Sequence, residues 1–471
     1  MKIPKTIENT KIFKSLWRTY RRVKNKHISK SSQKYIKEEA NWADHLMYNE
    51  IWPISIENDR TFFEILHEAH QNSILKLSTR KRIKVGFLVY SSSIWPYEEI
   101  YRLFDHDERF DPTVVIVGLD DGTKKTIQEQ YEITKRWFEN NSYRYVGVLN
   151  ENEKKNWKSF EFDIVFSAIP YTNILPRKFE FGELNVSTLL IYTPYGVAIN
   201  EMSDRYFNMK IHNIAWRLFY ETNIQKEMGK KCALNKGENI VVSGYPKIDK
   251  LIKKESMDYS HLWKGNDKAK RIIYAPHHSL MREESRYATF DDNYLFVFDY
   301  ARNHINETSW IIKPHPLLKK ATIQYGLFSS EAEYDAYLAE WEKLPNAKVV
   351  LNGDYFDYFV SSDAMILDSE SFLFEYQYTH KPLLFLTRET QTFNVFGEML
   401  LDILYKCPGN DYRSISDFLD SVVINGNDTM FEKRWTFFNN YLNYIKDNNG
   451  MGASEYIYSY VRDQIINKLQ N

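Results

Sequence analysis

The stretch ILDSESFLFEYQ (Ile366–Gln377) is informative about the fold, because a strand-like apolar run ends there in polar residues that begin a helix expected over residues 369–378. Two other pieces have the same arrangement, YAPHHS (Tyr274–Ser279) and IIKPHP (Ile311–Pro316), and in both of them histidines follow the apolar run. Ligands of open α/β sheets bind at the carboxyl ends of the strands. The three pieces together therefore predict a site for a phosphorylated ligand, most simply a nucleotide-linked donor.

Strand-like and helix-like runs alternate on both sides of these pieces, which predicts an α/β fold with mostly parallel sheets and crossover helices. In the first half, strands are expected at residues 83–90, 113–118, 144–149, 163–168, 187–192 and 240–243. In the second half, they are expected at residues 271–275, 310–313, 348–351, 364–367 and 383–386.

A chain of 471 residues is long for a single core, so we expect two globular domains. Residues 1–80 are interpreted as a helical N-terminal extension, and residues 81–250 as the first Rossmann-like domain. After a polar connector at 247–270, residues 270–430 form the second Rossmann-like domain. Aromatic helices at 431–471 are expected to pack back on the first domain.

The composition excludes several classes of protein. A formal net charge of −1 provides no overall attraction to nucleic acid. Cys232 and Cys407 have no zinc-site or disulfide spacing, which favours a reducing cytoplasm. No run approaches the roughly 20 apolar residues that span a bilayer. The basic segment 11–34 has apolar residues near helical spacing, so it either packs on its own domain or lies on the inner face of the cytoplasmic membrane.

Motifs of several common enzymes are missing from the sequence. It has no glycine-rich phosphate loop, no GxGxxG, no nucleophile elbow and no HExxH. These absences exclude the usual kinase, dehydrogenase, serine-hydrolase and zinc-protease interpretations.

Lys313 and His315 are candidate phosphate-binding residues at one strand end. Pro314 and Pro316 restrict the backbone around His315, so the imidazole is rigidly presented for donation to a phosphate or for proton transfer. Lys313 adds a positive charge for the same phosphates.

Pro276, His277 and His278 follow another strand and can contact a phosphate, an acceptor hydroxyl or a metal. Metal binding is disfavoured because no carboxylate or further histidine lies nearby at ligand spacing, so we expect neither a metal nor another cofactor.

Asp368, Ser369 and Ser371 begin the helix of the opening stretch, where backbone N–H groups and the helix dipole attract a phosphate. The alternative is that they only cap the helix. Glu375 lies deeper in the helix and either binds a ribose hydroxyl or faces solvent.

In the first domain, Tyr195 and Gly196 follow a predicted strand and are candidates for the acceptor side of the cleft. Gly196 would permit close backbone approach. Asp121, in Asp120-Asp121-Gly122, is either a base or part of an ordinary turn.

Together the motifs resemble the CDP-glycerol glycerophosphotransferase family of teichoic-acid and capsule polymer synthesis, over about residues 185–390. The resemblance is carried by Gly244–Asp249 (GYPKID), Tyr274–Pro276 (YAP), Ile312–His315 (IKPH), Asp368–Ser371 (DSES) and Lys381–Leu383 (KPL). It implies the GT-B architecture of two facing Rossmann-like domains, with the nucleotide donor bound to the second domain. It also implies a glycan or polyol-phosphate acceptor, either lipid-linked or free.

The chain departs from the family at Thr193–Gly196 (TPYG), where the family has Trp-His-Gly-Thr with a candidate general base. The base here is then expected to be His277, His278 or Asp121. Asp120–Gly122 and His315-Pro316 also resemble motifs of bacterial sialyltransferases, so a CMP-sugar or other nucleotide-sugar transferase is an alternative. A non-catalytic, GT-B-shaped binding subunit is the third hypothesis.

Overall fold

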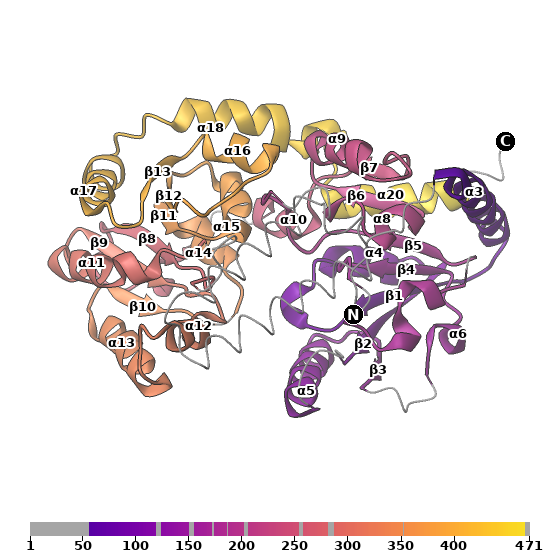
Figure 1. Cartoon of the computed structure of the whole chain (residues 1–471), viewed down its shortest axis with the longest axis horizontal. Coiled ribbons are helices and arrows are strands. Elements are labelled where there is room, and N and C mark those ends of the chain that lie inside the picture. Colours follow the sequence, from indigo (N-terminus) through magenta and orange to yellow (C-terminus); the bar gives the residue numbers. More distant parts are fainter. Residues whose placement is uncertain are drawn as a thin grey trace, which may run out of the picture. The chain divides into compact units, whose positions relative to one another are not determined.

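The computed structural model describes residues 56–118, 124–149, 155–171, 174–185, 187–201, 206–253, 258–280, 287–351 and 353–466. These residues form two compact units, each built around one parallel sheet (Figure 1). Within the described ranges, the β1–β7 unit contains residues 56–198, 206–253 and 439–466. The β8–β13 unit contains residues 199–201 and 258–438.

The sheet of the β1–β7 unit has the strand order β3-β2-β1-β4-β5-β6-β7, and all neighbours are parallel. Its strands are β1 (Ile83–Val89), β2 (Phe110–Val117), β3 (Tyr145–Val148), β4 (Ile164–Ser167), β5 (Leu189–Tyr192), β6 (Arg217–Tyr220) and β7 (Ile240–Val242). The order reverses between β1 and β4, as in doubly wound Rossmann-like folds. The alternation in the sequence correctly predicted this class of fold.

The helices of this unit are α3 (Ile56–Ser78), α4 (Glu98–His106), α5 (Lys124–Asn140), α6 (Trp157–Phe160), α8 (Lys210–Ile214), α9 (Asn223–Cys232), α10 (Pro246–Ile252), α19 (Tyr444–Asp447) and α20 (Ala453–Ile466). β6 was not expected from the sequence. Its four residues follow α8 closely, with no glycine or proline between them. Periodicity alone does not separate so short a strand from a buried helical segment.

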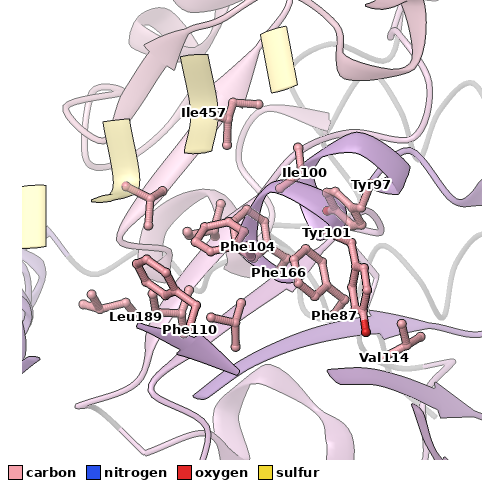
Figure 2. Close-up of a cluster of buried hydrophobic side chains, with 14 of the residues drawn as sticks. Phe87, Tyr97, Ile100, Tyr101, Phe104, Phe110, Val114, Phe166, Leu189 and Ile457 are labelled. Atoms are coloured by element: carbon pink, nitrogen blue, oxygen red, sulfur yellow. The ribbon is translucent and has the colours of Figure 1, made fainter. Parts of the chain in front are cut away.

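Aromatic side chains dominate the core on one face of this sheet (Figure 2). Phe87 of β1 and Phe166 of β4 stack with ring centroids 4.8 Å apart. The ring centroids of Phe104 in α4 and Tyr458 in α20 lie 5.1 Å apart. Ile457 of α20 also belongs to this core and is fully buried. The last described helix of the chain is therefore part of the core that the first strands build.

The segment Gly244–Asp249, which carried part of the family resemblance, holds this last helix in place. Asp249 is 1% exposed, and its carboxylate accepts bonds from Tyr444 Oη at 2.7 Å, from Ala453 N at 2.8 Å and from Ser454 N at 2.6 Å. The two N–H groups are the first of α20 and have no partner within their own helix. Asp249 thus supplies the acceptor and the negative charge that the start of α20 requires.

Gly244 allows the ring of Tyr444 to lie against the backbone. Its φ is +82°, and a Cβ at this position would meet ring atoms of Tyr444 at 2.2–2.5 Å. Beside it, Asn448 Nδ2 donates to the carbonyl oxygen of Ser243 at 2.8 Å. Both the backbone conformation and the close approach therefore require glycine.

The sheet of the β8–β13 unit has the order β10-β9-β8-β11-β12-β13 and is also parallel throughout. Its strands are β8 (Lys270–Ala275), β9 (Thr308–Ile312), β10 (Ala347–Val349), β11 (Ala364–Leu367), β12 (Leu383–Thr387) and β13 (Tyr405–Pro408). Here the order reverses between β8 and β11 (Figure 1). The unit therefore has the same Rossmann-like topology as the first.

The helices of this unit are α11 (Phe290–Asn303), α12 (Leu318–Tyr325), α13 (Glu331–Lys343), α14 (Phe356–Ser361), α15 (Glu370–Glu375), α16 (Val395–Leu401), α17 (Tyr412–Asp417) and α18 (Phe431–Phe437). α17 continues into a π-helix at Phe418–Ile424, and the chain returns to the β1–β7 unit in a second π-helix at Phe438–Leu442. The aromatic tail is thus shared between the units, with α18 in one and α20 in the other. No described helix is both long and apolar enough to cross a membrane.

Candidate functional site

The three pieces singled out in the sequence lie at the ends of three adjacent strands. β9, β8 and β11 are neighbours in the sheet. The last residue pairs are Tyr274↔Ile312 between β8 and β9, and Ala275↔Leu367 between β8 and β11. The polar residues that follow these strands consequently share one edge of the sheet. That edge includes the reversal of strand order between β8 and β11, where ligands of doubly wound sheets bind.

Three histidines meet at this edge. The ring centroid of His315 lies 4.0 Å from that of His278 and 5.2 Å from that of His277. The main chain continues the sheet pairing beyond the strands, because Lys313 N donates to Tyr274 O at 2.8 Å and His315 N donates to Pro276 O at 3.0 Å. These bonds place the two histidine-bearing segments side by side.

The hydrogen bonds of His315 and His277 determine which ring nitrogen carries the proton. Nδ1 of His315 accepts the N–H of Leu317 at 3.1 Å. Nδ1 of His277 accepts the N–H of Ser279 at 3.4 Å and lies 2.8 Å from Ser279 Oγ. That hydroxyl oxygen already accepts the N–H groups of Tyr287 at 2.9 Å and of Ala288 at 3.4 Å, so it donates its own proton to the ring. In the neutral form of either ring, the proton is then on Nε2. The two side chains offer N–H donors, which suit an anion.

The same argument bears on metal binding. One ring nitrogen from each of the three histidines lies within 4.8 Å of the others, a spacing that a metal ion could use. A metal binds the unprotonated ring nitrogen, however, and in His277 and His315 that atom already accepts a hydrogen bond. The donor set therefore fits a phosphate group better than a cation.

Burial and the neighbouring Lys313 lower the pKa of His315 to about 4. The imidazole is consequently neutral over the whole physiological pH range. Burial also lowers the pKa of Lys313, whose Nζ lies 5.8 Å from the ring centroid of Tyr355. Tyr355 Oη donates to Glu375 Oε2 at 2.6 Å, and Glu375 is only 3% exposed.

Glu375 is therefore buried and not exposed to solvent. Its hydrogen bond fixes the position of Tyr355, whose ring lies next to Lys313. Sequence reasoning missed Tyr355. It precedes α14 after a short strand, and nothing in its local pattern distinguishes it from the other tyrosines among the 34 of the chain.

Asp368 connects two of the strand ends. Its side chain is 1% exposed, and its carboxylate accepts bonds from His277 N at 2.6 Å, from Thr289 N at 2.6 Å and from Thr289 Oγ1 at 3.0 Å. Thr289 is the N-cap residue of α11. The sequence suggested that Asp368 contacts the donor; in the structure, these bonds position the backbone that carries His277.

Burial raises the pKa of Asp368 to about 6, and this shift has a measurable consequence for stability. Since the folded-state pKa lies above the unfolded value of about 3.9, the stabilising contribution is complete below pH 4 and is lost as the pH rises through 6. We expect Asp368→Asn, which cannot ionise, to gain about 2 kcal/mol of unfolding free energy relative to the wild type between pH 4 and pH 7. Urea unfolding of the wild type and of Asp368→Asn at the two pH values measures this difference in unfolding free energy.

Asp299→Asn is the control for this prediction, because that side chain is 53% exposed on α11. Its difference from the wild type should stay constant with pH. A constant difference for Asp368→Asn as well would contradict the assignment.

The remaining candidates are two serines at the start of α15, one aspartate, and the pair Tyr195 and Gly196 in the other unit. Ser369 is the N-cap of α15, and within the described chain its hydroxyl accepts no bond from that helix. Ser371 belongs to α15, but its side chain is outside the described residues, as is Asp121. Tyr195 and Gly196 follow β5 in the β1–β7 unit. A Cβ at Gly196 would meet no atom within 4 Å, so the described protein itself does not require glycine there.

Comparisons with known proteins agree with this fold. The protein-family model for CDP-glycerol:poly(glycerophosphate) glycerophosphotransferase matches residues 207–463, more than half of the 471-residue chain. None of the curated protein sequences compared with the chain matches it significantly.

Two solved structures illustrate the similarity of fold. The wall teichoic acid polymerase TagF is 13% identical, with a TM-score of 0.55 over 93% of this chain and 98% of that one. A putative UDP-N-acetylglucosamine 2-epimerase from Listeria monocytogenes is 16% identical, with a TM-score of 0.51 over 81% of this chain and 96% of that one. At such identities the likeness establishes the fold class, the GT-B type with two Rossmann-like units. With the family match, it identifies the chain as a transferase enzyme that belongs to the CDP-glycerol:poly(glycerophosphate) glycerophosphotransferase family.

Proposed function

We propose that this protein transfers glycerophosphate from CDP-glycerol to a hydroxyl group at the end of a poly(glycerophosphate) or similar teichoic-acid or capsule chain. The observation that carries the proposal is the group of N–H donors from His277 and His315 beside Lys313, at the strand-order reversal of the β8–β13 sheet. Such donors match the two phosphates of a nucleotide-linked donor, and the family match supports CDP-glycerol as that donor.

In the proposed reaction, the acceptor oxygen attacks the phosphorus that carries glycerol. The bond from this phosphorus to the oxygen bridging the two phosphates breaks, and CMP leaves with the electron pair. Lys313 and the Nε2–H groups of His277 and His315 stabilise the negative charge that develops on the phosphates. Ser369, Ser371 and the first N–H groups of α15 complete the donor site in this proposal, with Pro276 and Asp368 positioning the histidine segment. Since these groups are cationic or N–H donors, we propose that the reaction needs no metal ion.

The site of action follows from the acceptor. We propose that a growing chain carried on a membrane lipid is elongated at the cytoplasmic face of the membrane, with the basic segment 11–34 in contact with that surface. This segment lies outside the described residues.

A thermal-shift experiment with purified protein tests the choice of donor. Ligands that bind the folded state stabilise it by about 2.7 kcal/mol at 100 times their dissociation constant, so the apparent melting temperature rises. We expect CDP-glycerol to raise it more than CMP, a CMP-linked sugar or a UDP-linked sugar does, and we expect the same shift in EDTA.

Transfer of labelled glycerophosphate to an oligomeric acceptor then confirms catalysis. A shift with the CMP-linked sugar alone would support the CMP-sugar transferase instead. A response restricted to UDP-linked sugars would refute the proposal, and loss of the CDP-glycerol shift in EDTA would refute its metal independence.

A further inference from the structure

Lys313, one of the candidate phosphate-binding residues, is a partly buried cation at the end of β9. Among the residues that the structure describes, its ammonium group forms no ion pair and donates no hydrogen bond. Burial lowers its pKa, and no neighbouring carboxylate offsets this shift. A buried charge is costly unless another group stabilises it. Whatever lies against Lys313 therefore decides how well the lysine keeps its charge.

The group that lies against Lys313 is the aromatic ring of Tyr355. The Nζ atom of Lys313 is 5.8 Å from the ring centroid, which is within the range of a cation–π interaction. The negative face of the ring attracts an ammonium group without neutralising it. A carboxylate at this place would attract the lysine more strongly, but it would also repel the phosphates of a donor. The ring therefore stabilises a positive charge that stays available to an anionic ligand.

The ring of Tyr355 is itself held by its surroundings. Its Oη donates to Oε2 of Glu375 at 2.6 Å, and Glu375 is a residue of α15 that is 3% exposed. The centroids of three phenylalanine rings lie within 5.0 Å of its own, namely those of Phe356 at 4.9 Å, Phe359 at 5.0 Å and Phe372 at 4.6 Å. Packed rings and one hydrogen bond together fix both the position of the tyrosine ring and the direction of its faces.

The short helix α14, which follows Tyr355, is anchored at its other end without help from the tyrosine. Nζ of Lys381 donates to the carbonyl oxygen of Phe359 at 3.1 Å and to that of Val360. Carbonyl groups in the last turn of a helix have no partner within the helix, so the lysine satisfies two of them. We therefore expect α14 to stay folded when Tyr355 is replaced by another apolar residue.

We propose that Tyr355 is a positioning residue of the donor site, whose ring keeps the Lys313 ammonium group charged and directed at the phosphates of the nucleotide-linked donor. Glu375 contributes through the tyrosine hydroxyl, by fixing the ring. Tyr355 acts through Lys313 and takes no part in making or breaking bonds. The inference rests on the proposed function and concerns the β8–β13 unit alone.

Tyr355→Leu and Tyr355→Phe in the full-length protein test the role of the ring. Leucine keeps an apolar side chain beside Lys313 but has no aromatic face, whereas phenylalanine keeps the face and lacks the hydroxyl. We expect Tyr355→Leu to raise KM for CDP-glycerol about 3- to 30-fold, the range that a partly buried cation–π interaction gives. Its kcat should change by less than about twofold, because the interaction is present both before and during the reaction. Tyr355→Phe should keep KM within about threefold of the wild type.

Tyr405→Leu is the matched control for Tyr355→Leu. The Oη of Tyr405 also donates to a carboxylate, Oδ1 of Asp428 at 3.0 Å, and its ring centroid is 5.3 Å from that of Phe418. Tyr405 belongs to β13, which three strands separate from β9 in the sheet. The control thus removes a similar ring and hydrogen bond away from the donor site. Its kcat and KM should equal those of the wild type, even where its melting temperature is lower.

A double-mutant cycle with Lys313→Met separates a positioning role from a merely structural one. If the ring acts through the ammonium group, Tyr355→Leu should lower kcat/KM for CDP-glycerol several-fold in the wild-type background. In the Lys313→Met background the same change should lower it by less than about twofold, because the partner is already gone. Equal losses in the two backgrounds would overturn the inference, as would equal losses for Tyr355→Leu and Tyr355→Phe.

The same assays distinguish failure of this inference from failure of the proposed function. A wild type that transfers glycerophosphate from CDP-glycerol, together with a Tyr355→Leu variant of unchanged KM, would overturn the role of Tyr355 alone. If the wild type itself transfers no glycerophosphate from CDP-glycerol, the proposed function fails and the inference fails with it.

Discussion

Replacing Asp249 with alanine is expected to lower the unfolding free energy of the protein by about 3–5 kcal/mol. Asp249 is 1% exposed and accepts three hydrogen bonds, from Tyr444 and from the first two N–H groups of α20, at 2.6–2.8 Å. Alanine would leave these donors buried without an acceptor. Since domains are stable by only about 5–15 kcal/mol, the change removes a large part of the total. Urea unfolding followed by circular dichroism measures the loss.

Glu455→Ala is the matched control for Asp249→Ala. Glu455 is an exposed acidic residue in the first turn of the same helix, so the control removes a carboxylate near the same helix end without opening the core. It should cost about 0.3–1 kcal/mol through the helix dipole. Equal losses for the two variants would show that Asp249 acts as a helix-end charge alone, contrary to the geometry.

Replacing His315 with alanine is expected to reduce kcat/KM for CDP-glycerol by about 10²- to 10³-fold, the usual effect of removing one donor to a developing negative charge. The imidazole is neutral because its pKa is lowered to about 4, and its Nδ1 accepts the N–H of Leu317 at 3.1 Å. Its contribution is therefore a hydrogen bond from Nε2, not a positive charge. Steady-state transfer assays, normalised to correctly folded protein, measure the effect.

Two further variants make this prediction specific. Glutamine carries an N–H donor near the position of Nε2, so His315→Gln should retain more activity than His315→Ala. His261→Ala, at an exposed histidine of the same unit, should be unaffected. The wild-type pH profile should also lack an ionisation of His315 between pH 5.5 and 8. Equal activity of the alanine and glutamine variants would contradict the Nε2 donor role.

Local patterns in the sequence predicted most strands of both sheets. β1, β8 and β11 are apolar runs with polar residues at their ends, and in a parallel sheet this pattern is nearly unambiguous. β6 and β13 escaped prediction, although β4 and β11 are equally short. β13 contains Lys406 and Pro408, which interrupt an apolar run, and β6 begins with Arg217 and has no glycine or proline beside it. A run that short has no periodicity to distinguish a strand from a buried turn of helix.

The candidate site also contains residues that a local sequence pattern predicts and residues that only packing brings together. His277, His315 and Lys313 could be predicted as candidates because each lies within three residues of a strand end, and strand ends meet at one sheet edge. Glu375 and Tyr355 form a pair across 20 residues, and Asp368 binds the backbone of His277 across 91 residues. Such partners are set by packing, so no local spacing reveals them.

Short-range order along the chain was enough to predict the α/β class, the three polar strand ends and the family resemblance. The tertiary structure decided what the polar groups do. In the folded protein, Asp249 accepts hydrogen bonds from the start of α20, and Asp368 accepts one from the backbone of His277. Glu221 is a buried carboxylate whose pKa is raised by burial. The physical reason is that burial and hydrogen-bond partners, which set both the cost of a charge and its reactivity, come from residues far away in the chain.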